Sequence, residues 1–313
     1  MTYKQLTTRR IFVICICKIG LLFLLVGRMF YMQFLKKDEY KTLSDLNRIK
    51  TLILNPSRGK IFDIDKKIVA ENNVCFRLVL DKKINNNFLL EIELITKILE
   101  LDKEQVSLIN KRVKNGERRF PITIIEHLNW WQLSVIEERK GELKSVFIDT
   151  GLDRYYPSNY ATAHLIGYLG RLQEKDKARY NIANKSFKLG KSGIESYYEN
   201  KLRGNFGYKR IEVNAHGKYV RELGQTPSTP GENLYLNIDL ELQNKTLSYL
   251  DQKGCSAVVM NCQNGAILIS HSTPSYDPNK FNNLSTKYWH NLTNNQHAPL
   301  IDKTIQNLYP PGS

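Results

Sequence analysis

Several patterns that usually accompany a metal, nucleotide or redox site are missing from this sequence of 313 residues. Its five cysteines form no Cys-x-x-Cys pair and no Cys/His zinc pattern, and its six histidines form no His-Glu-x-x-His motif. It also contains no glycine-rich phosphate loop. We therefore expect no cofactor and no metal. A bridge between Cys255 and Cys262, which flank a predicted hairpin, is conceivable, but we expect unpaired thiols.

Long blocks of one charge are also missing, although the chain is strongly basic. It has 46 lysines and arginines against 31 aspartates and glutamates, which gives a formal net charge of +15. These basic residues are spread along the chain and are not gathered by any zinc-finger spacing. A distributed charge of this kind indicates a solvated basic surface. We therefore predict no nucleic-acid partner; such a partner would show itself as a steeply salt-dependent affinity for DNA.

Only one apolar run is long enough to cross a membrane, and it lies near the N-terminus. It extends from Ile11 to about Phe34, and some twenty helical residues at ~1.5 Å each span the ~30 Å hydrocarbon layer. Lys18 opposes insertion by about 2.5–3.5 kcal/mol, whereas the twelve Ile, Leu, Phe and Val residues from Ile11 to Val26 favour it by roughly 5 kcal/mol. Insertion is expected despite Lys18, which could face a membrane partner.

The flanks of this run predict its processing and its orientation. No A-x-A-like cleavage site follows it, which favours a retained signal anchor over a removed signal peptide. Lys4, Arg9 and Arg10 precede it, and basic flanks of this kind stay in the cytoplasm. We therefore predict a cytoplasmic tail over 1–10, an anchor over 11–34 and an exported remainder.

The segment after the anchor mixes strand and helix signals, as in an α+β fold. Asn55–Asp63 begins with turn chemistry and continues into an alternating strand, and 75–81 alternates as a second strand. Apolar residues at helical spacing predict two helices between about 87 and 116.

A further helix is expected over about 127–140, and it carries Trp130 and Trp131. We interpret these tryptophans as core or inter-domain packing rather than as a binding platform. Together with the two helices before it, this helix predicts a small α+β insertion over about 82–150.

The second half of the chain contains a helix signal, a linker signal and two hairpin signals. Gly190–Gly204 has apolar residues at helical spacing. Glu212–Leu223 is typical of a hairpin, and the proline-rich stretch Gln225–Glu232 is typical of a linker. Two β-rich runs within 256–270 are joined through Asn264-Gly265, a strong hairpin signal.

The last five residues, Tyr-Pro-Pro-Gly-Ser, form a predicted turn that presents the hydroxyl of Ser313. In serine enzymes of the Ser-x-x-Lys type the pair stands in the first turn of a helix, where the amine can take the hydroxyl proton. The lysine would be residue 316, which this sequence does not contain. We therefore expect no complete catalytic set within these residues.

Three other motifs invite a functional interpretation, and local structure explains each of them better. Ser57–Lys60 is the only intact Ser-x-x-Lys match, but its proline and glycine predict a turn rather than a helix. Lys191–Gly193 resembles the Lys-Ser/Thr-Gly triplet of active-serine enzymes, yet it opens a predicted helix instead of lying on a strand. His164 adjoins an apolar helical run and is expected to be packed rather than a ligand.

Eight segments together resemble one protein family, and they stand in that family's order. They are the short tail with its anchor, "LSDLNRI", "PSRGKIFD" with "VAENN", "RYYP" with "AHLIGYLG", "GKSGIESYYENKLRG", "EVNAHGKYVREL", "SYDPNKF" and "YPPGS". The sequence resembles the class B high-molecular-weight penicillin-binding proteins, in particular their elongation type, and the resemblance covers essentially the whole chain.

The resemblance implies a fold class and a domain plan. It implies an α+β protein with a single N-terminal transmembrane helix, an elongated pedestal (dimerisation) domain over 35–228 and an incomplete transpeptidase domain over 229–313. It also implies a single-pass protein of the bacterial inner membrane, with a cytoplasmic N-terminus and its bulk in the periplasm. One departure is local: Asp63–Lys66 stands where the family usually has Asp-Arg-Asn-Gly.

The resemblance also implies an activity and partners. Family members are DD-transpeptidases that cross-link peptidoglycan stem peptides through a serine acyl-enzyme and are acylated by β-lactams, and Ser313 matches the nucleophile. The implied partners are stem peptides, a SEDS-family glycosyltransferase and a rod-shape scaffold protein.

The motifs that follow the nucleophile in the family are absent from this sequence, so we expect the chain to be inactive in cross-linking alone. The alternatives are a non-catalytic membrane scaffold that binds the glycosyltransferase, and the product of an interrupted or split gene. We also expect an unpaired strand edge, and hence proteolytic sensitivity, after about residue 230.

Overall fold

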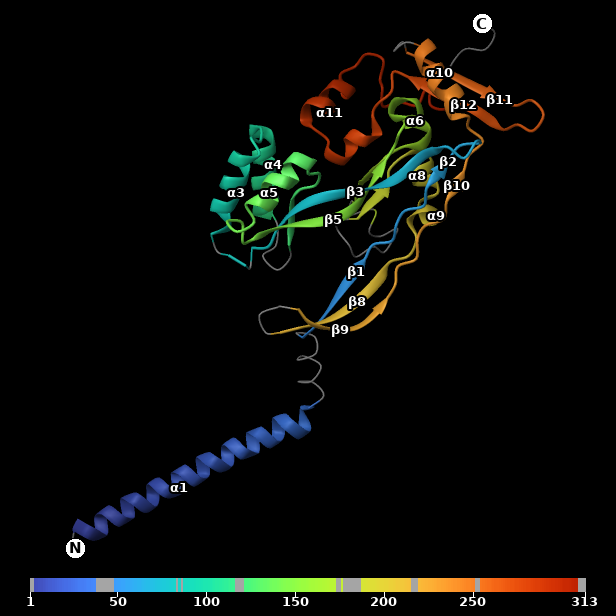
Figure 1. Ribbon diagram of the computed structural model, residues 1–313. Helices are drawn as coiled ribbons and strands as arrows, with labels where there is room; N and C mark the ends of the chain where they lie inside the picture. The colour runs from blue at the N-terminus through green and yellow to red at the C-terminus, as the bar shows by residue number, and fades with distance from the viewer. Residues whose placement is uncertain are drawn as a thin grey trace. The chain divides into compact units, whose positions relative to one another are not determined.

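The computed structural model describes most of the chain (Figure 1). The described residues are 3–37, 48–82, 84–85, 87–115, 121–172, 176, 187–214, 219–250 and 254–308. They belong to two compact units, each assembled from segments that are distant in sequence: 1–55 with 206–228, and 56–205 with 229–313. The chain thus leaves the first unit after Asn55 and returns to it only once.

The first unit begins with a long apolar helix. α1 (Tyr3–Phe30) continues into a π-helical turn, η1 (Tyr31–Leu35). Within Ile14–Leu35 the mean hydropathy reaches 1.9, and none of that apolar window is buried. Among the described residues this is the one helix long and apolar enough, by length and composition, to cross a membrane. The anchor segment is therefore helical, with the exposed apolar surface that contact with lipid requires.

A three-stranded antiparallel sheet completes the first unit. Its strands, in spatial order, are β1 (Ile49–Leu54), β8 (Gly207–Val213) and β9 (Tyr219–Thr226). The hairpin predicted over Glu212–Leu223 is confirmed by the pairing of β8 with β9, and its turn at 215–218 lies outside the described residues.

The linker predicted over Gln225–Glu232 is only partly correct. β9 extends to Thr226, so the first residues of the stretch belong to a strand. Further on, Thr229 and Asn205 exchange two backbone hydrogen bonds of 3.0 Å, and the Gly231 N–H donates to the Ser57 carbonyl at 2.9 Å. Turn-type composition here indicates irregular backbone, but that backbone is hydrogen-bonded rather than free.

A five-stranded sheet organises the second unit. Its strands are β10 (Leu234–Tyr235), β2 (Ile61–Phe62), β3 (Ile68–Leu80), β4 (Ile122–Ile125) and β5 (Val146–Tyr155). β3 is the longest, and it pairs antiparallel with β2, β4 and β5. β2 also pairs with β10 in parallel, which brings the chain after residue 230 onto the same sheet. The strand predicted over 75–81 lies within β3 and is confirmed.

The strand expected to follow Gly59 is shorter than predicted, because a tight turn ends it. The Lys67 N–H donates to Asp63 Oδ1 at 2.6 Å, and Lys66 adopts a left-handed backbone conformation with φ 63°. This turn occupies the place where the sequence departs from the family's usual Asp-Arg-Asn-Gly. The turn forms all the same, and it connects β2 directly to β3.

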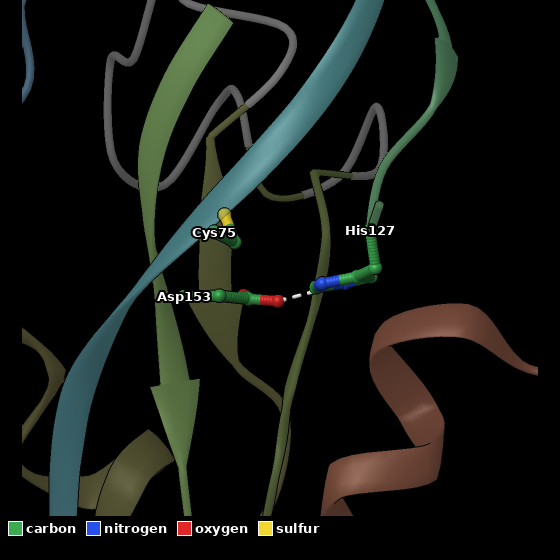
Figure 2. Close-up of side chains that lie close together, drawn as sticks. All are labelled: Cys75, His127 and Asp153. Carbon is green, nitrogen blue, oxygen red and sulfur yellow. Dashed lines mark ion pairs between the residues drawn. The ribbon is translucent and has the colours of Figure 1, made fainter. Parts of the chain in front are cut away.

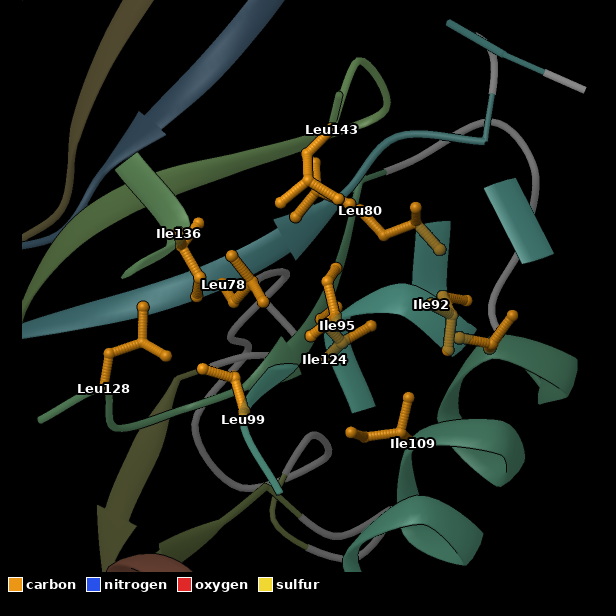
Figure 3. Packing of buried hydrophobic residues seen from close by; sticks show 12 residues of the cluster. Leu78, Leu80, Ile92, Ile95, Leu99, Ile109, Ile124, Leu128, Ile136 and Leu143 are labelled. Atoms are coloured by element: carbon orange, nitrogen blue, oxygen red, sulfur yellow. The ribbon is translucent and has the colours of Figure 1, made fainter. Parts of the chain in front are cut away.

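Three helices pack on one end of this sheet, where helical spacing in the sequence predicted them, and the insertion over about 82–150 stays a prediction. They are α3 (Phe88–Ile98), α4 (Lys103–Asn115) and α5 (Trp130–Glu138). Their apolar faces meet the sheet in a core that we call the insertion core (Figure 3). Its buried residues are Leu78, Leu80, Ile92, Ile95, Leu99, Ile109, Val113, Ile124, Leu128, Ile136, Leu143 and Val146. Each fully buried Leu, Ile or Val stabilises the fold by roughly 1.5–3 kcal/mol.

The interpretation of Trp130 and Trp131 as core residues is wrong, because the two residues are 73% and 55% exposed, respectively. Inter-domain packing stays a prediction. α5 buries Ile136 about two turns further on, while the tryptophans occupy its first turn and are not among the buried residues of the insertion core. That turn is capped by Asn129, whose side chain accepts the backbone N–H of Gln132 at 2.8 Å. Trp130 lies at the edge of the insertion core, where its ring is 6.0 Å from that of Phe76.

Short elements fill the rest of the second unit. They are α6 (Asn159–Ile166), β6 (Leu169–Arg171), β7 (Lys188–Gly190), α8 (Gly193–Tyr197), α9 (Glu199–Arg203), α10 (Leu240–Leu250), β11 (Cys255–Met260), β12 (Ile267–Thr273), η2 (Pro278–Asn283) and α11 (Thr286–Thr293). The hairpin predicted over 256–270 is confirmed as β11 and β12. The helix predicted over Gly190–Gly204 is two short helices that meet at Tyr198. Cys255 and Cys262 form no bridge.

Candidate functional site

The predicted nucleophile position, Ser313, lies outside the described residues together with the rest of Tyr309–Ser313. The segment that leads toward it is anchored on β12. The backbone N–H of Lys303 donates to Ser272 Oγ at 3.1 Å, and its Nζ donates to the Ala298 carbonyl at 3.2 Å. Lys303 is buried, so these contacts hold the chain firmly a short distance before the Pro-Pro-Gly sequence.

The two other serine motifs have structural roles, as the sequence predicted. Ser57–Lys60 runs through an irregular segment without helix, so its serine and lysine do not share a helical face. Ser192 stands at the N-cap of α8 in an extended conformation, with φ −149° and ψ 171°. Lys191–Gly193 is therefore the entrance to a helix and not a strand that lines a substrate pocket.

Four charged residues from three of the family motifs form a buried cluster that we call the Arg–Glu network. Arg58 Nε lies 2.6 Å from Glu195 Oε2, and Arg154 Nε lies 2.7 Å from Glu195 Oε1. The second glutamate, Glu199, accepts from an Arg58 Nη at 2.7 Å. All four are at least nine-tenths buried, and Glu195 is fully buried. Each oxygen of the Glu195 carboxylate thus faces one guanidinium, the charge-assisted geometry that gives strong hydrogen bonds.

Backbone groups join the Arg–Glu network to the segments around it. Arg154 donates through Nη1 to the Gly59 carbonyl at 2.8 Å, and the Gly190 N–H donates to Glu199 Oε2 at 2.9 Å. Gly59 has to be glycine, because a Cβ there would lie 1.8 Å from the Glu232 carbonyl oxygen. The network therefore ties the segment before β2, the end of β5 and the pair α8–α9 into one body.

The electrostatics of the network keep its members charged. Burial alone would raise the pKa of the Glu195 carboxyl, but Arg58 and Arg154 outweigh burial and lower that pKa below its usual value. In the same way burial would lower the pKa of Arg58, yet Glu195 and Glu199 raise it on balance. Burial also raises the pKa of Tyr156, whose hydroxyl donates to Glu195 Oε1 at 3.4 Å. Because its charges are paired with one another, the Arg–Glu network has a structural role. It offers no free base or nucleophile for a reaction.

The sequence carried a signal for this network that pattern reasoning did not use. All four residues belong to motifs on which the family resemblance rests, namely "PSRGKIFD", "RYYP" and "GKSGIESYYENKLRG". Glu195 and Glu199 are four residues apart, the spacing that places two side chains on one side of a helical segment. The sequence could not show that Glu195 pairs with Arg58, 137 residues away, and with Arg154, 41 residues away.

An open groove of about 560 Å³ lies beside α8 and the β11–β12 turn. His164, Ile194, Tyr197, Ile267 and Asp302 are among its lining residues. Burial is the main cause that lowers the pKa of His164, to about 4, and its ring packs edge-on against Tyr276 at 5.1 Å between centroids. The prediction that His164 is packed is thus confirmed, and the groove is lined mainly by apolar side chains.

Among the described residues, one group of side chains could hold a metal ion (Figure 2). Cys75, His127 and Asp153 each offer one ligand atom, and these atoms all lie within 4.8 Å of one another. The sequence predicted no metal because these residues are far apart in the chain and match no ligand spacing. Only the folded sheet brings them together.

Two protein-family models match the chain. The Penicillin-binding Protein dimerisation domain matches residues 53–236, and the Penicillin binding protein transpeptidase domain matches residues 255–313. The first match covers more than half of the chain and includes the whole Arg–Glu network.

Individual proteins of known name agree with this result. The chain is 34% identical over 316 residues to the Peptidoglycan D,D-transpeptidase MrdA of Acinetobacter baumannii and 30% identical over 296 residues to that of Escherichia coli K12. These alignments cover 99% and 92% of this chain and 47% of each relative. The chain therefore spans about half the length of the curated relatives it matches.

A solved structure extends the likeness to three dimensions. The structure described as a complex between Penicillin-Binding Protein (PBP2) and MreC from Helicobacter pylori matches with a TM-score of 0.73 at 29% identity, and covers 85% of this chain and 50% of that chain. The motif residues, the family models and the fold agree, and the chain therefore belongs to the penicillin-binding proteins that carry a dimerisation domain and a transpeptidase domain, within which it is similar to PBP2.

Proposed function

We propose that this chain acts in peptidoglycan synthesis during cell elongation, as part of a membrane-anchored D,D-transpeptidase. The observation that carries the proposal is the dimerisation-family match over 53–236, whose motif residues close into the Arg–Glu network. The match to the transpeptidase family over 255–313 supports the same function. In this proposal 35–228 form the pedestal and 229–313 begin the transpeptidase domain.

Ser313 is the proposed nucleophile position. In the proposed reaction its hydroxyl oxygen attacks the carbonyl carbon of the penultimate D-Ala of a stem peptide. The hydroxyl proton passes to a base, the peptide bond breaks, and the terminal D-Ala leaves with its amine protonated. The amine of a second stem peptide then displaces the serine from the ester and completes the cross-link. A β-lactam would acylate the same oxygen by opening its ring.

Penicillin labelling of the gene product in its native membrane tests this assignment. Membranes are treated with a labelled penicillin, the protein is isolated and digested, and its peptides are analysed by mass spectrometry. Because these residues contain no complete catalytic set, the test uses the gene product in its membrane and not the isolated chain. The proposal expects the penicilloyl mass there on the peptide that contains Ser313 and its loss in Ser313→Ala, with Ser57→Ala as the matched control that keeps the label. A label carried by another serine would overturn the assignment.

The proposed topology places residues 1–10 in the cytoplasm, 11–34 across the inner membrane and the rest in the periplasm. Support comes from the basic residues ahead of the span and from the exposed apolar helix α1. Protease treatment of spheroplasts tests it: the domain after residue 35 is expected to be digested from outside. Protection of that domain in intact spheroplasts and digestion only after lysis would reverse the topology.

A second candidate function is that of a scaffold for partners in the membrane and periplasm. The Helicobacter pylori neighbour is a complex of PBP2 with MreC, which supports a rod-shape scaffold partner. Lys18 inside the apolar span supports a SEDS-family glycosyltransferase as a membrane partner, because a lysine in lipid is stabilised by a neighbouring helix. Co-purification from membranes tests the second partner: Lys18→Leu is expected to lose the glycosyltransferase, and Lys37→Leu, outside the span, to keep it.

A further inference from the structure

Three potential ligand side chains gather on one face of the long β3–β5 pair, well away from the transpeptidase segment in sequence. Cys75 comes from β3, Asp153 from β5, and His127 from the segment that follows β4 (Figure 2). Figure 2 shows the Asp153 carboxylate and the His127 ring pointing toward each other, with the Cys75 side chain beside them. Cys75 and Asp153 are buried, and His127 is partly exposed.

Strand register explains why these residues meet. Asn73 pairs with Asp153 and Cys75 pairs with Gly151, so Cys75 and Asp153 are diagonal neighbours on the same face of the sheet. The backbone of the third segment is fixed by the Leu128 N–H, which donates to the Phe76 carbonyl at 2.9 Å. Two paired strands therefore hold Cys75 and Asp153, and a segment hydrogen-bonded to β3 holds His127.

Two buried atoms in this cluster have only each other as partners. His127 Nε2 lies 2.9 Å from Asp153 Oδ2, within ion-pair distance, and neither atom has another hydrogen-bond partner among the described residues. Asp153 is 7% exposed, so water reaches it poorly. A cation bound between the two atoms would give each of them a partner without the need for a proton on the ring nitrogen.

The surroundings orient the carboxylate as a ligand and restrict the choice of ion. Lys188 donates through Nζ to Asp153 Oδ1 at 2.9 Å and to Asn282 Oδ1 at 3.1 Å, which leaves Oδ2 directed at the cluster. Metal-binding carboxylates are usually held by such an outer hydrogen bond. The Arg77 guanidinium lies over Gly151, the residue opposite Cys75. The positive charges of Lys188 and Arg77 repel a cation, so they disfavour a metal ion that is held by charge attraction alone. The ion must instead bond strongly to thiolate and imidazole.

We propose that Cys75 Sγ, His127 Nε2 and Asp153 Oδ2 bind a divalent transition-metal ion of the zinc type. Sulfur, imidazole and carboxylate donors together select zinc over magnesium or calcium, which prefer oxygen. On binding, the Cys75 thiol releases its proton to solvent, and a water molecule completes the tetrahedron. Bonds of about 2.0–2.3 Å place donors within ~4 Å of one another, so only a small closure of the cluster is needed. The ion would fasten the segment after β4 to β3 and β5.

Cobalt and zinc titrations of the full chain in detergent test the site. Co²⁺ bound by a thiolate gives a sulfur-to-cobalt charge-transfer absorption, and Zn²⁺ affinity follows from competition with a chromophoric chelator. The matched control is the double variant Cys255→Ser/Cys262→Ser, which removes the two other cysteines outside the span but keeps the cluster. Mg²⁺ serves as the hard-ion comparison, and circular dichroism establishes that each variant is folded.

The proposal expects one equivalent of Co²⁺ with the charge-transfer band in the wild-type chain and in the control. Cys75→Ser is expected to lose the band, and His127→Gln and Asp153→Asn each to weaken Zn²⁺ binding by at least ~10-fold. No band in the wild-type chain, or a band that survives Cys75→Ser, would overturn the proposal. Equal affinity for Mg²⁺ would do so as well, since it would indicate charge attraction alone. Cys75→Ala, which leaves an apolar side chain at this buried position, provides the second test if Cys75→Ser fails to fold.

Discussion

The Arg–Glu network and the insertion core lie in the same compact unit and are buried by opposite physical means. The buried residues of the insertion core are all aliphatic, and they come from α3–α5, from the sheet beneath them and from the connecting segments at Leu128 and Leu143. The Arg–Glu network contains only charges, two guanidiniums against two carboxylates, with Glu195 completely buried. Both clusters exclude water, but they respond differently to a change in a single residue.

The difference follows from what each residue needs from its neighbours. A side chain in the insertion core contributes to the free energy of unfolding roughly in proportion to the apolar area it buries. When it is shortened, that contribution is reduced, but no neighbouring side chain loses a polar or charged partner. A charge in the Arg–Glu network is tolerated only because its partner is present. Removal of the partner leaves an uncompensated charge in a medium of low dielectric constant. Each residue of the insertion core therefore adds its own share of stability, whereas the Arg–Glu network specifies a single arrangement of the segments that it joins.

The largest expected effect is that of Glu195→Ala. It leaves Arg58 and Arg154 buried without their shared carboxylate, and breaking such a buried pair destabilises a protein by about 3–5 kcal/mol. Native-state hydrogen exchange measures the effect locally, because the Gly190 amide bonds to Glu199 within the network. Its protection should fall far more than that of amides in α3–α5. Exposed Glu241→Ala is the matched control, and an equal effect of both variants would contradict the role assigned to the network.

Ile95→Ala is expected to come next, at about 2–5 kcal/mol, because it opens a cavity among well-packed aliphatic side chains. Ile95 is 1% exposed, whereas Leu89 on the same helix is 61% exposed and provides the control, with an expected change within ~0.5 kcal/mol. Urea unfolding followed by tryptophan fluorescence measures both variants, since Trp130 and Trp131 report on the insertion. If the two substitutions had equal effects, α3 would not be packed as described.

Acid should destabilise the Arg–Glu network more than the insertion core, which contains no titratable group. The effect should be smaller than that of removing the Glu195 carboxylate. The pKa of Glu195 is lower in the folded chain than its ordinary value of 4.5, so its stabilising contribution is complete above that value and is lost as pH falls through the folded pKa. Urea midpoints of wild type and Glu195→Gln measured between pH 7 and pH 3 test this. The gap between them should narrow toward pH 3. A gap that is constant with pH would mean that the Glu195 charge contributes nothing.

How much of this could be predicted from sequence depends on the distance over which the responsible interactions act. The helices of the insertion follow from the spacing of Ile92, Ile95 and Leu99, because helical periodicity is a local property. The β11–β12 hairpin follows from Asn264-Gly265 for the same reason. The shortened strand β2 did not follow, since the turn that ends it depends on several hydrogen bonds to Asp63, among them that of the Lys67 backbone N–H to Asp63 Oδ1.

The charged network and the metal cluster could not be assembled from sequence, because both depend on register between distant segments. Cys75 meets Asp153 only in the observed pairing of β3 with β5, and a shift of one residue would place them on opposite faces. Arg58 contacts Glu195 across 137 residues of sequence. The sequence did supply the motifs that contain Arg58, Arg154 and Glu195, but not the reason for their presence.

Trp130→Ala is expected to have the smallest effect and tests the corrected orientation of α5. The indole is 73% exposed, and its one described ring contact, with Phe76 at 6.0 Å, is of a kind that contributes about 0.5–1.5 kcal/mol. The free energy of unfolding should therefore fall by no more than ~1.5 kcal/mol. Urea titrations followed by circular dichroism measure it, since the substitution itself alters the fluorescence. Trp131→Ala removes the neighbouring exposed indole and is the matched control. A loss as large as that of Ile95→Ala would return Trp130 to the insertion core and would make the boundary between the packed and the exposed face of α5 wrong.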